Sequence, residues 1–449
     1  MRKLLLSLAV VAVAATSCQK DVVDNNTPME NITIEESVSP YAVSEEEALA
    51  RLDAELATLY GEDTRASQRQ VRSIHSVKLN DIAPATRSND INVENLLYIV
   101  EFENNQGSAI LGADERVDDV FAVLENSTIT AEDFENAANG VNKDELGTYL
   151  AGTIANQAVE QASARGILPD DDYRVNYTKE VEIDSDFSYP ILLTCWGNKG
   201  IYNDECDDEY GDDCTVLSEA VAMAQVALHN RVQNYYNIIL EGRVFDRTIL
   251  EMKRVGYTIP NDMEETVNNE VALYMLAISN AIGIDYTSPI GPMTTPQDML
   301  DLLVSMGYND VNWDLLDDLN PEQYFTTTIK DRIYTNEWPL IMSGTDSSLN
   351  KSWCWIIDGY KYNLYKVYDC LTINGVLISE TYIYDRSVLK VHCDFGQEGR
   401  YNGYYLFDNF SWVTPVESSD MYPSYGDVAG PTINVNYNSN LKVLSYRIL

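Results

Sequence analysis

Apolar residues recur at helical spacing directly after a polar start at Ser44. Ser44 and Glu47 form a capping-box pattern, and Leu52 and Leu56 continue an apolar stripe that ends at Gly61. This spacing predicts an amphipathic helix. Further helices are predicted at about 130–165, 218–234, 264–282 and 296–307.

Short apolar runs between turn residues predict strands in two regions. In the first, Leu96–Phe102 and Ser108–Ala113 flank the turn Asn104–Gly107, a pattern typical of a hairpin. In the second, apolar and polar residues alternate from about Tyr334 onward. The predicted strands are 74–79, 96–102, 108–113, 120–124, 338–343, 353–360, 364–371, 375–384, 389–395 and 403–407.

Helices followed by antiparallel strands indicate an α+β fold. The 449 residues are enough for two or three domains. We expect a polar tether over 19–40, a small domain over 41–165, an exposed linker over 166–188 and a larger domain over 189–449. Pro169, followed by three aspartates, motivates the linker.

The N-terminus has the pattern of a lipoprotein signal peptide. Arg2 and Lys3 precede the apolar run Leu4–Ala15, which is too short to span a bilayer. Small residues then lead to Cys18, as in a lipobox, although an ordinary signal peptide is the alternative. We expect residues 1–18 to be the signal and Cys18 to carry a lipid. The lipid would hold the protein on the outer membrane, on its periplasmic side or at the cell surface.

Charge and cysteine usage limit the partners. The 71 acidic and 30 basic residues give a net charge of −41, which repels nucleic acid and anionic membrane faces.

Three His and no CxxC pair make a metal site unexpected, and no cofactor is expected. Besides Cys18 there are six cysteines, which could form three disulfides in an oxidising envelope; a Cys206–Cys214 disulfide is favoured.

Several segments carry a family resemblance in one consistent order. They are Gly107–Val117, Pro190–Asn203, Glu219–Gln225, Trp338–Gly344, Trp355–Tyr360 and Asn402–Tyr404. Together they resemble streptopain-type, papain-like cysteine proteases, and cover most of residues 45–410. The resemblance implies a papain-like fold with an enlarged antiparallel sheet, preceded by a small α+β propeptide-like domain.

The positions that correspond to the family's catalytic residues hold other residue types. The family's nucleophilic Cys, seven residues before the Gln of an Ala-Gln pair, corresponds to Ser218. Its His, five residues before an Asp-Gly pair, corresponds to Trp353. Its oxyanion Gln corresponds to Asn198, and its Asn and Trp correspond to Asp394 and Phe395. The resemblance therefore implies a site in which all these roles have changed.

These substitutions predict loss of catalysis. An indole can only donate a hydrogen bond, so Trp353 cannot act as a base, and losing a nucleophile or base costs about 10⁶-fold in a measured protease. Cys214 has acidic neighbours that oppose thiolate formation. Cys354 should face away from Trp353 on its strand, and His392 is interpreted as structural. His229 and His75 are interpreted in the same way.

Three functions remain open at this stage. The first is a non-catalytic lipoprotein that binds peptides or inhibits a related cysteine protease. The second is an active cysteine endopeptidase made as a zymogen, with arginines as processing points. The third is a surface adhesin or glycan-binding protein that uses the tyrosine-rich segments 360–384 and 401–408. The candidate processing points are Arg65, Arg69, Arg72, Arg87 and Arg165.

Overall fold

The computed structural model of the protein describes one compact unit, which lies within Ser39–Leu449. The described residues are 41–61, 64, 67–78, 82, 95–139, 145–164, 174–210, 215–232, 236–240, 242–286, 294–315, 324–346, 351–373, 376–407 and 439–448.

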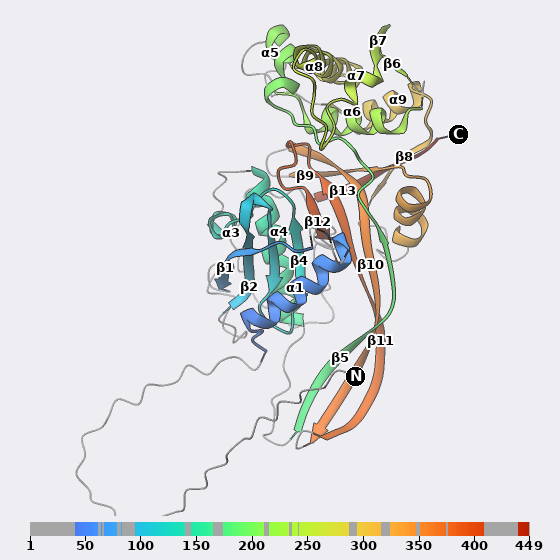
Figure 1. The fold of residues 1–449 in the computed structure, drawn as a ribbon. Coiled ribbons are helices and arrows are strands. Elements are labelled where there is room, and N and C mark those ends of the chain that lie inside the picture. Colours follow the sequence, from blue (N-terminus) through green and yellow to red (C-terminus); the bar gives the residue numbers. More distant parts are fainter. Residues whose placement is uncertain are drawn as a thin grey trace, which may run out of the picture. The chain divides into compact units, whose positions relative to one another are not determined.

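The N-terminal part (Tyr41–Ala164) is a four-stranded antiparallel sheet with helices on both faces. Helix α1 packs on one face through Leu52 and Leu56, and α3 and α4 pack on the other through Phe134 and Leu150; Figure 1 shows this arrangement. The elements are α1 (Glu45–Tyr60), β1 (Val71–Lys78), β2 (Asn95–Phe102), η2 (Glu103–Asn105), β3 (Ser108–Gly112), β4 (Val120–Leu124), α3 (Ala131–Asn139) and α4 (Glu145–Ala164).

Local sequence signals account for α1. The Ser44 hydroxyl accepts a hydrogen bond from the Glu47 amide, which satisfies one of the free amides of the first turn. The helix ends at Gly61, whose φ of 84° favours glycine. The predictions for this helix and for the hairpin β2–β3 are confirmed.

The C-terminal part begins with a strand and then places helices before most of its strands. Its elements are β5 (Arg174–Ser188), η3 (Gly200–Tyr202), α5 (Asp204–Tyr210), α6 (Ser218–Asn230), β6 (Asn237–Leu240), β7 (Arg243–Asp246), α7 (Arg247–Leu250), α8 (Glu264–Ala281), α9 (Pro296–Ser305), β8 (Asn309–Leu315), the π-helix η5 (Phe325–Thr335), β9 (Leu340–Asp346), β10 (Lys351–Ile373), β11 (Val376–Asp394), β12 (Gly403–Leu406) and β13 (Ser439–Arg447).

One antiparallel sheet runs through both parts. Within the described residues it has eleven strands in the order β1-β2-β3-β4-β12-β11-β10-β9-β13-β8, and β5 also pairs with β10. The two parts join where β12 pairs with β4, with Gly403 opposite Leu124 and Tyr404 opposite Val123. The fold class is α+β, as predicted, and the antiparallel sheet is large.

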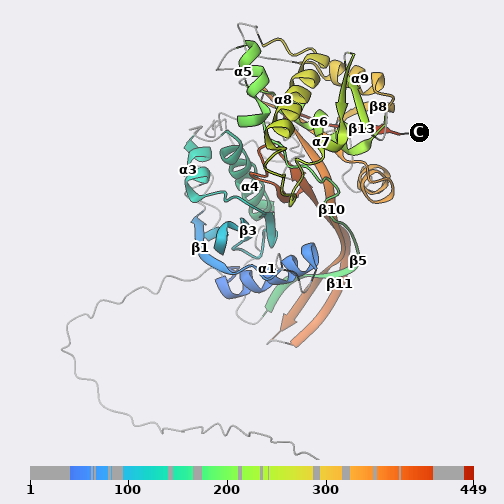
Figure 2. The ribbon, with the colours of Figure 1, turned by 45° about the horizontal axis from the view of Figure 1, so that its top comes forward.

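Strands β5, β10 and β11 form a long three-stranded ribbon, which Figure 2 shows from a second side. Two pairs of strands predicted separately, 353–360 with 364–371 and 375–384 with 389–395, are each one strand. Apolar and polar residues alternate through the predicted break, with Lys361 and Asn363 at the polar positions between Tyr360 and Leu364. The strand therefore continues across it, paired with β11 and β5, and the Lys361 side chain is satisfied by Glu55 from α1.

The prediction of an exposed linker over 166–188 is wrong for its second half. Residues Arg174–Ser188 form β5, which pairs with β10 along its whole length. Acidic and apolar residues alternate in Glu180–Asp184, which is a strand pattern. The first half of the segment lies outside the described residues. No described helix is long and apolar enough to cross a membrane.

We predict that Gly403→Ala weakens the junction of β12 with β4. A Cβ atom at residue 403 would lie 2.1 Å from the carbonyl oxygen of Val123, so the strands would have to separate. The expected loss is about 3 kcal/mol in the free energy of unfolding, measured by urea denaturation. The control, Gly242→Ala, shares a positive φ but has open space around it, and should cost about 1 kcal/mol. Equal losses would show that the junction is not tightly packed.

Candidate functional site

Helix α6 begins at Ser218 and packs against strand β10. It is buried along most of its length, and Ala220, Ala222 and Ala224 bring its backbone close to its neighbours. A helix N-terminus carries a partial positive charge that stabilises an anion, which is why reactive thiolates are often found there. The start of α6 therefore offers a position at which a thiolate would be stabilised, but the side chain of residue 218 is a hydroxyl.

The Ser218 hydroxyl is engaged on both sides. Its Oγ accepts a 3.0 Å hydrogen bond from the Cys354 amide on β10 and donates a 3.1 Å hydrogen bond to Glu219 Oε2. Ser218 is 5% exposed and Glu219 is 4% exposed. A serine hydroxyl has one proton, which here is directed to a buried carboxylate. The hydroxyl therefore ties α6 to β10.

Trp353 lies next to this contact, one residue before Cys354 on β10. The two side chains point to opposite faces of the strand, as predicted. Cys354 belongs to the core around α6, whereas the Trp353 indole packs against the core around α4 and η5. Trp353 is therefore adjacent in sequence to the residue that contacts the helix start, but its side chain fills core space on the opposite face of β10.

The segment around Asn198 is held against α6 by Trp196. The Trp196 amide donates to Gln225 Oε1 at 3.0 Å, and its indole Nε1 donates to the Lys253 carbonyl at 2.8 Å. Asn198 Oδ1 accepts a 3.3 Å hydrogen bond from Gln397 Nε2 and is largely buried. The structure thus brings the Asn198 segment next to the loop that follows Asp394 and Phe395.

Asp394 and Phe395 have structural contacts at the end of β11. Asp394 Oδ1 accepts a 2.9 Å hydrogen bond from the Gly396 amide, and the Phe395 amide donates to Asn402 Oδ1 at 3.0 Å. Burial raises the pKa of Asp394 to about 7. The Phe395 ring packs on Trp355, with the ring centroids 5.9 Å apart. Both residues therefore shape the loop and its core.

His392 is the centre of a buried group of charges. Its Nδ1 lies 2.6 Å from Asp358 Oδ1, and its Nε2 lies 3.5 Å from Glu125 Oε1. Burial alone would lower the pKa of His392, but the two carboxylates outweigh it and raise the pKa to about 10. The imidazole is thus a cation with a structural role. Glu125 follows β4, so this group spans both parts of the sheet.

Three of the described thiols lie in environments that oppose thiolate formation. Burial, followed by the carboxylates of Asp394 and Glu125, raises the pKa of the Cys195 thiol, and burial raises the pKa of Cys354 and Cys393. Cys206 is disulfide-bonded; its predicted partner Cys214, and Cys18, lie outside the described residues. The free thiols among the described residues are Cys195, Cys354, Cys370 and Cys393.

The remaining histidines have ordinary positions. His229 Nε2 lies 2.9 Å from the Glu337 carbonyl near the end of α6, and burial lowers its pKa. His75 is exposed on β1, opposite Ile99. Within the part of the chain that the structure describes, no group of three or more His, Cys, Asp or Glu side chains could hold a metal ion.

The sequence could not identify Asp358 and Glu125 as partners of His392. Asp358 belongs to the Asp-Gly pair that served only to locate Trp353, and Glu125 lies 267 residues from His392 in a different part of the chain. A single charged residue after a strand is not a distinctive signal. Only the pairing of β4 with β12 brings Glu125 to His392.

A helix that presents a nucleophile position to an antiparallel sheet is the arrangement of papain-like cysteine peptidases. Residues 196–405 match the model of the Peptidase C10 family. This range contains all five predicted site positions, which are Asn198, Ser218, Trp353, Asp394 and Phe395. The catalytic roles of these positions stay predictions.

Solved structures of related proteases show a distant similarity. A cysteine-to-alanine mutant of a prointerpain A fragment from Prevotella intermedia is 17% identical, with a TM-score of 0.47, and the match covers 78% of this chain and 94% of that one. Active wild-type interpain A cysteine protease from the same organism is 18% identical, with a TM-score of 0.36, covering 57% and 94%. No curated protein matches the chain.

We predict that His392→Gln lowers stability and flattens its pH dependence. Its folded pKa is raised above the unfolded value, so its contribution is complete at pH 6 and is lost as the pH rises through about 10. The substitution leaves Asp358 and Glu125 without their cation, which should cost about 3 kcal/mol at pH 6.

Urea denaturation at pH 6, 8 and 10 measures both effects. The matched control is His75→Gln on exposed β1, which should change stability by no more than about 0.5 kcal/mol. If the unmodified protein and His392→Gln lose stability in parallel between pH 6 and 10, His392 does not carry the charge assigned to it.

Proposed function

We propose that this protein is a non-catalytic member of the Peptidase C10 family that acts by binding. The observation that carries the proposal is the burial of the Ser218 hydroxyl, which corresponds to the family's nucleophile position by the resemblance and is 5% exposed. A nucleophile has to reach its substrate. Here the hydroxyl accepts from the Cys354 amide and donates to Glu219, which is itself 4% exposed, so both groups are enclosed between α6 and β10.

The indole and the thiols near Ser218 are also poorly suited to act as a substitute base or nucleophile. Trp353 offers only a donor, and Cys354 is buried on the face of β10 that packs against α6. Raised pKa values keep the Cys195 and Cys354 thiols protonated at neutral pH. These facts disfavour the alternative of an active zymogen with a displaced thiol nucleophile.

The cellular setting is part of the same proposal. The basic start, apolar run and Cys18 support export as a lipoprotein attached to the outer membrane, on its periplasmic side or at the cell surface. The partners in this proposal are peptides or a related cysteine protease. The net charge of −41 favours neutral or cationic partners over nucleic acid.

We predict that the purified mature protein neither cleaves unfolded casein nor reacts at one cysteine with a thiol-directed active-site probe. The Ser218→Ala variant should likewise show neither casein cleavage nor labelling of a single cysteine. It should cost about 2 kcal/mol in the free energy of unfolding, because the Cys354 amide and the Glu219 carboxylate lose their shared partner.

Ser305→Ala is the control, because Ser305 is exposed at the end of α9 and bonds only its own helix. Its stability should change by no more than about 0.5 kcal/mol. Casein cleavage that disappears in Ser218→Ala would reject the non-catalytic proposal, and so would cleavage together with labelling of a single cysteine.

A second candidate, glycan binding, is favoured by exposed aromatic and apolar residues on β11. Tyr382 is 50% exposed and Tyr384 is 48% exposed, with Ile383 between them. In contrast, the tyrosines of segment 401–408 are buried at Tyr401, Tyr404 and Tyr405, so this segment offers no tyrosine surface.

We predict that any glycan binding depends on the exposed β11 tyrosines. A glycan array probed with the protein should lose its signal in the double variant Tyr382→Ser, Tyr384→Ser, because flat rings provide stacking surface for sugars. The matched control is Tyr236→Ser, which is also exposed but lies before β6. A blank array for the unmodified protein would count against this candidate.

A further inference from the structure

Helix α1 of the N-terminal part is bound to the ribbon by one glutamate and two lysines. Glu55 Oε2 accepts a 2.6 Å hydrogen bond from Lys361 Nζ, and Glu55 Oε1 accepts a 2.7 Å hydrogen bond from Lys390 Nζ. Lys361 and Lys390 are cross-strand neighbours on β10 and β11, and all three side chains are largely buried. One carboxylate from α1 thus holds both strands.

The two lysines depend on this carboxylate. Side by side, two ammonium groups repel each other, and burial adds to the cost of charging them. Burial, and to a lesser degree Lys390, lowers the pKa of Lys361, whereas Glu55 raises it. Although burial works in the opposite direction, the two lysines lower the pKa of Glu55 to about 2. If α1 left, both cations would lose their counterion.

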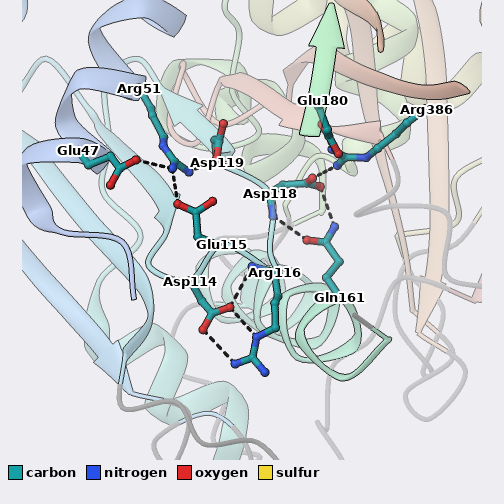
Figure 3. Close-up of polar contacts among 10 residues, drawn as sticks. All are labelled: Glu47, Arg51, Asp114, Glu115, Arg116, Asp118, Asp119, Gln161, Glu180 and Arg386. Carbon is teal, nitrogen blue, oxygen red and sulfur yellow. Dashed lines mark hydrogen bonds and ion pairs between the residues drawn. The ribbon is translucent and has the colours of Figure 1, made fainter. Parts of the chain in front are cut away.

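A second contact joins the loop before β4 to the ribbon, as Figure 3 shows. Asp118 forms an ion pair with Arg386 of β11, and Arg386 Nη1 also lies 2.8 Å from Glu180 Oε2 of β5. Gln161 of α4 fixes Asp118 by accepting from its amide at 2.8 Å and donating to its carboxylate at 2.7 Å. This contact therefore connects α4, the β3–β4 loop, β5 and β11.

A third contact is the sheet itself. The edge of β12 is covered by β4, and the buried His392 cation depends on Glu125 at the end of β4. Tyr404 of β12 packs in the core of α1 together with Leu52 and Val123. Loss of the N-terminal part would expose a sheet edge and an apolar face and would leave several buried cations unpaired.

We propose that the N-terminal part (Tyr41–Ala164) remains bound to the C-terminal part when the chain is cut between Ala164 and Arg174. The two parts would then act together, and the N-terminal part would not be released as a separate inhibitor. The inference goes beyond the proposed function and does not depend on whether the protein has catalytic activity.

The test is a cut at a single engineered point in the full chain. A recognition sequence for a site-specific protease replaces the residues between Ala164 and Arg174. The cut protein is then analysed by gel filtration and native mass spectrometry at micromolar concentration. We expect one species that contains both fragments, and its urea-induced separation should occur near the unfolding midpoint of the uncut protein. Fragments that elute separately without denaturant would overturn the proposal.

A pair of variants tests the role of the Glu55 contact. In the cut protein, Glu55→Gln should lower the urea concentration that separates the fragments by about 1 M. Glu47→Gln, on an exposed turn of the same helix and paired with Arg51, should leave it unchanged. Equal effects of the two substitutions would overturn the role given to Glu55.

Asp118→Asn provides an independent measurement if Glu55→Gln does not fold. It removes the charge that faces Arg386 and leaves the Glu55 contact intact. We expect a smaller decrease than for Glu55→Gln, because Glu180 still pairs with Arg386. Fragment separation that is unaffected by Asp118→Asn would overturn the role of this contact. Casein assays on the cut protein separate a failure here from a failure of the proposed function.

Discussion

The pairing of β12 with β4 is the contact on which the rest of this unit depends. It extends a small four-stranded sheet into one of eleven strands among the described residues. Gly403 permits it, because any side chain there would meet the Val123 carbonyl. The same pairing brings Glu125 to His392, so the backbone junction also sets up the buried charges. Backbone geometry thus decides which electrostatic partners are available.

The residues of the candidate site make structural contacts. Helix α6 starts against β10 in the arrangement of a papain-like peptidase, and the domain matches Peptidase C10 over residues 196–405. Ser218 uses its hydroxyl to link the helix to the strand. Asp394 and Phe395 likewise serve the loop and core. These contacts serve packing.

Features determined by nearby residues could be predicted from the sequence, and features determined by distant partners could not. The capping box and apolar stripe of α1, and the turn between β2 and β3, are local signals. Spacing from the Ala-Gln and Asp-Gly pairs also predicts Ser218 and Trp353 as site positions, and their roles stay predictions. In contrast, the contact of Glu55 with Lys361 joins residues 306 positions apart and has no local signal. The prediction of a linker over β5 is wrong because its partner strand β10 follows much later in the chain.

The chain has few cations, so the burial of some of them bears on the charge of the surface. The chain has 30 basic residues against 71 acidic ones, and several of the basic residues are buried in contacts inside the unit. Lys361, Lys390 and Arg116 are each largely buried against carboxylates, and Arg247 is buried against the carbonyl end of α6. These cations contribute little to the field at the surface. Carboxylates are buried as well, at Asp114, Glu219, Asp358 and Asp394, so the surface keeps the acidic excess of the composition, which repels anionic macromolecules.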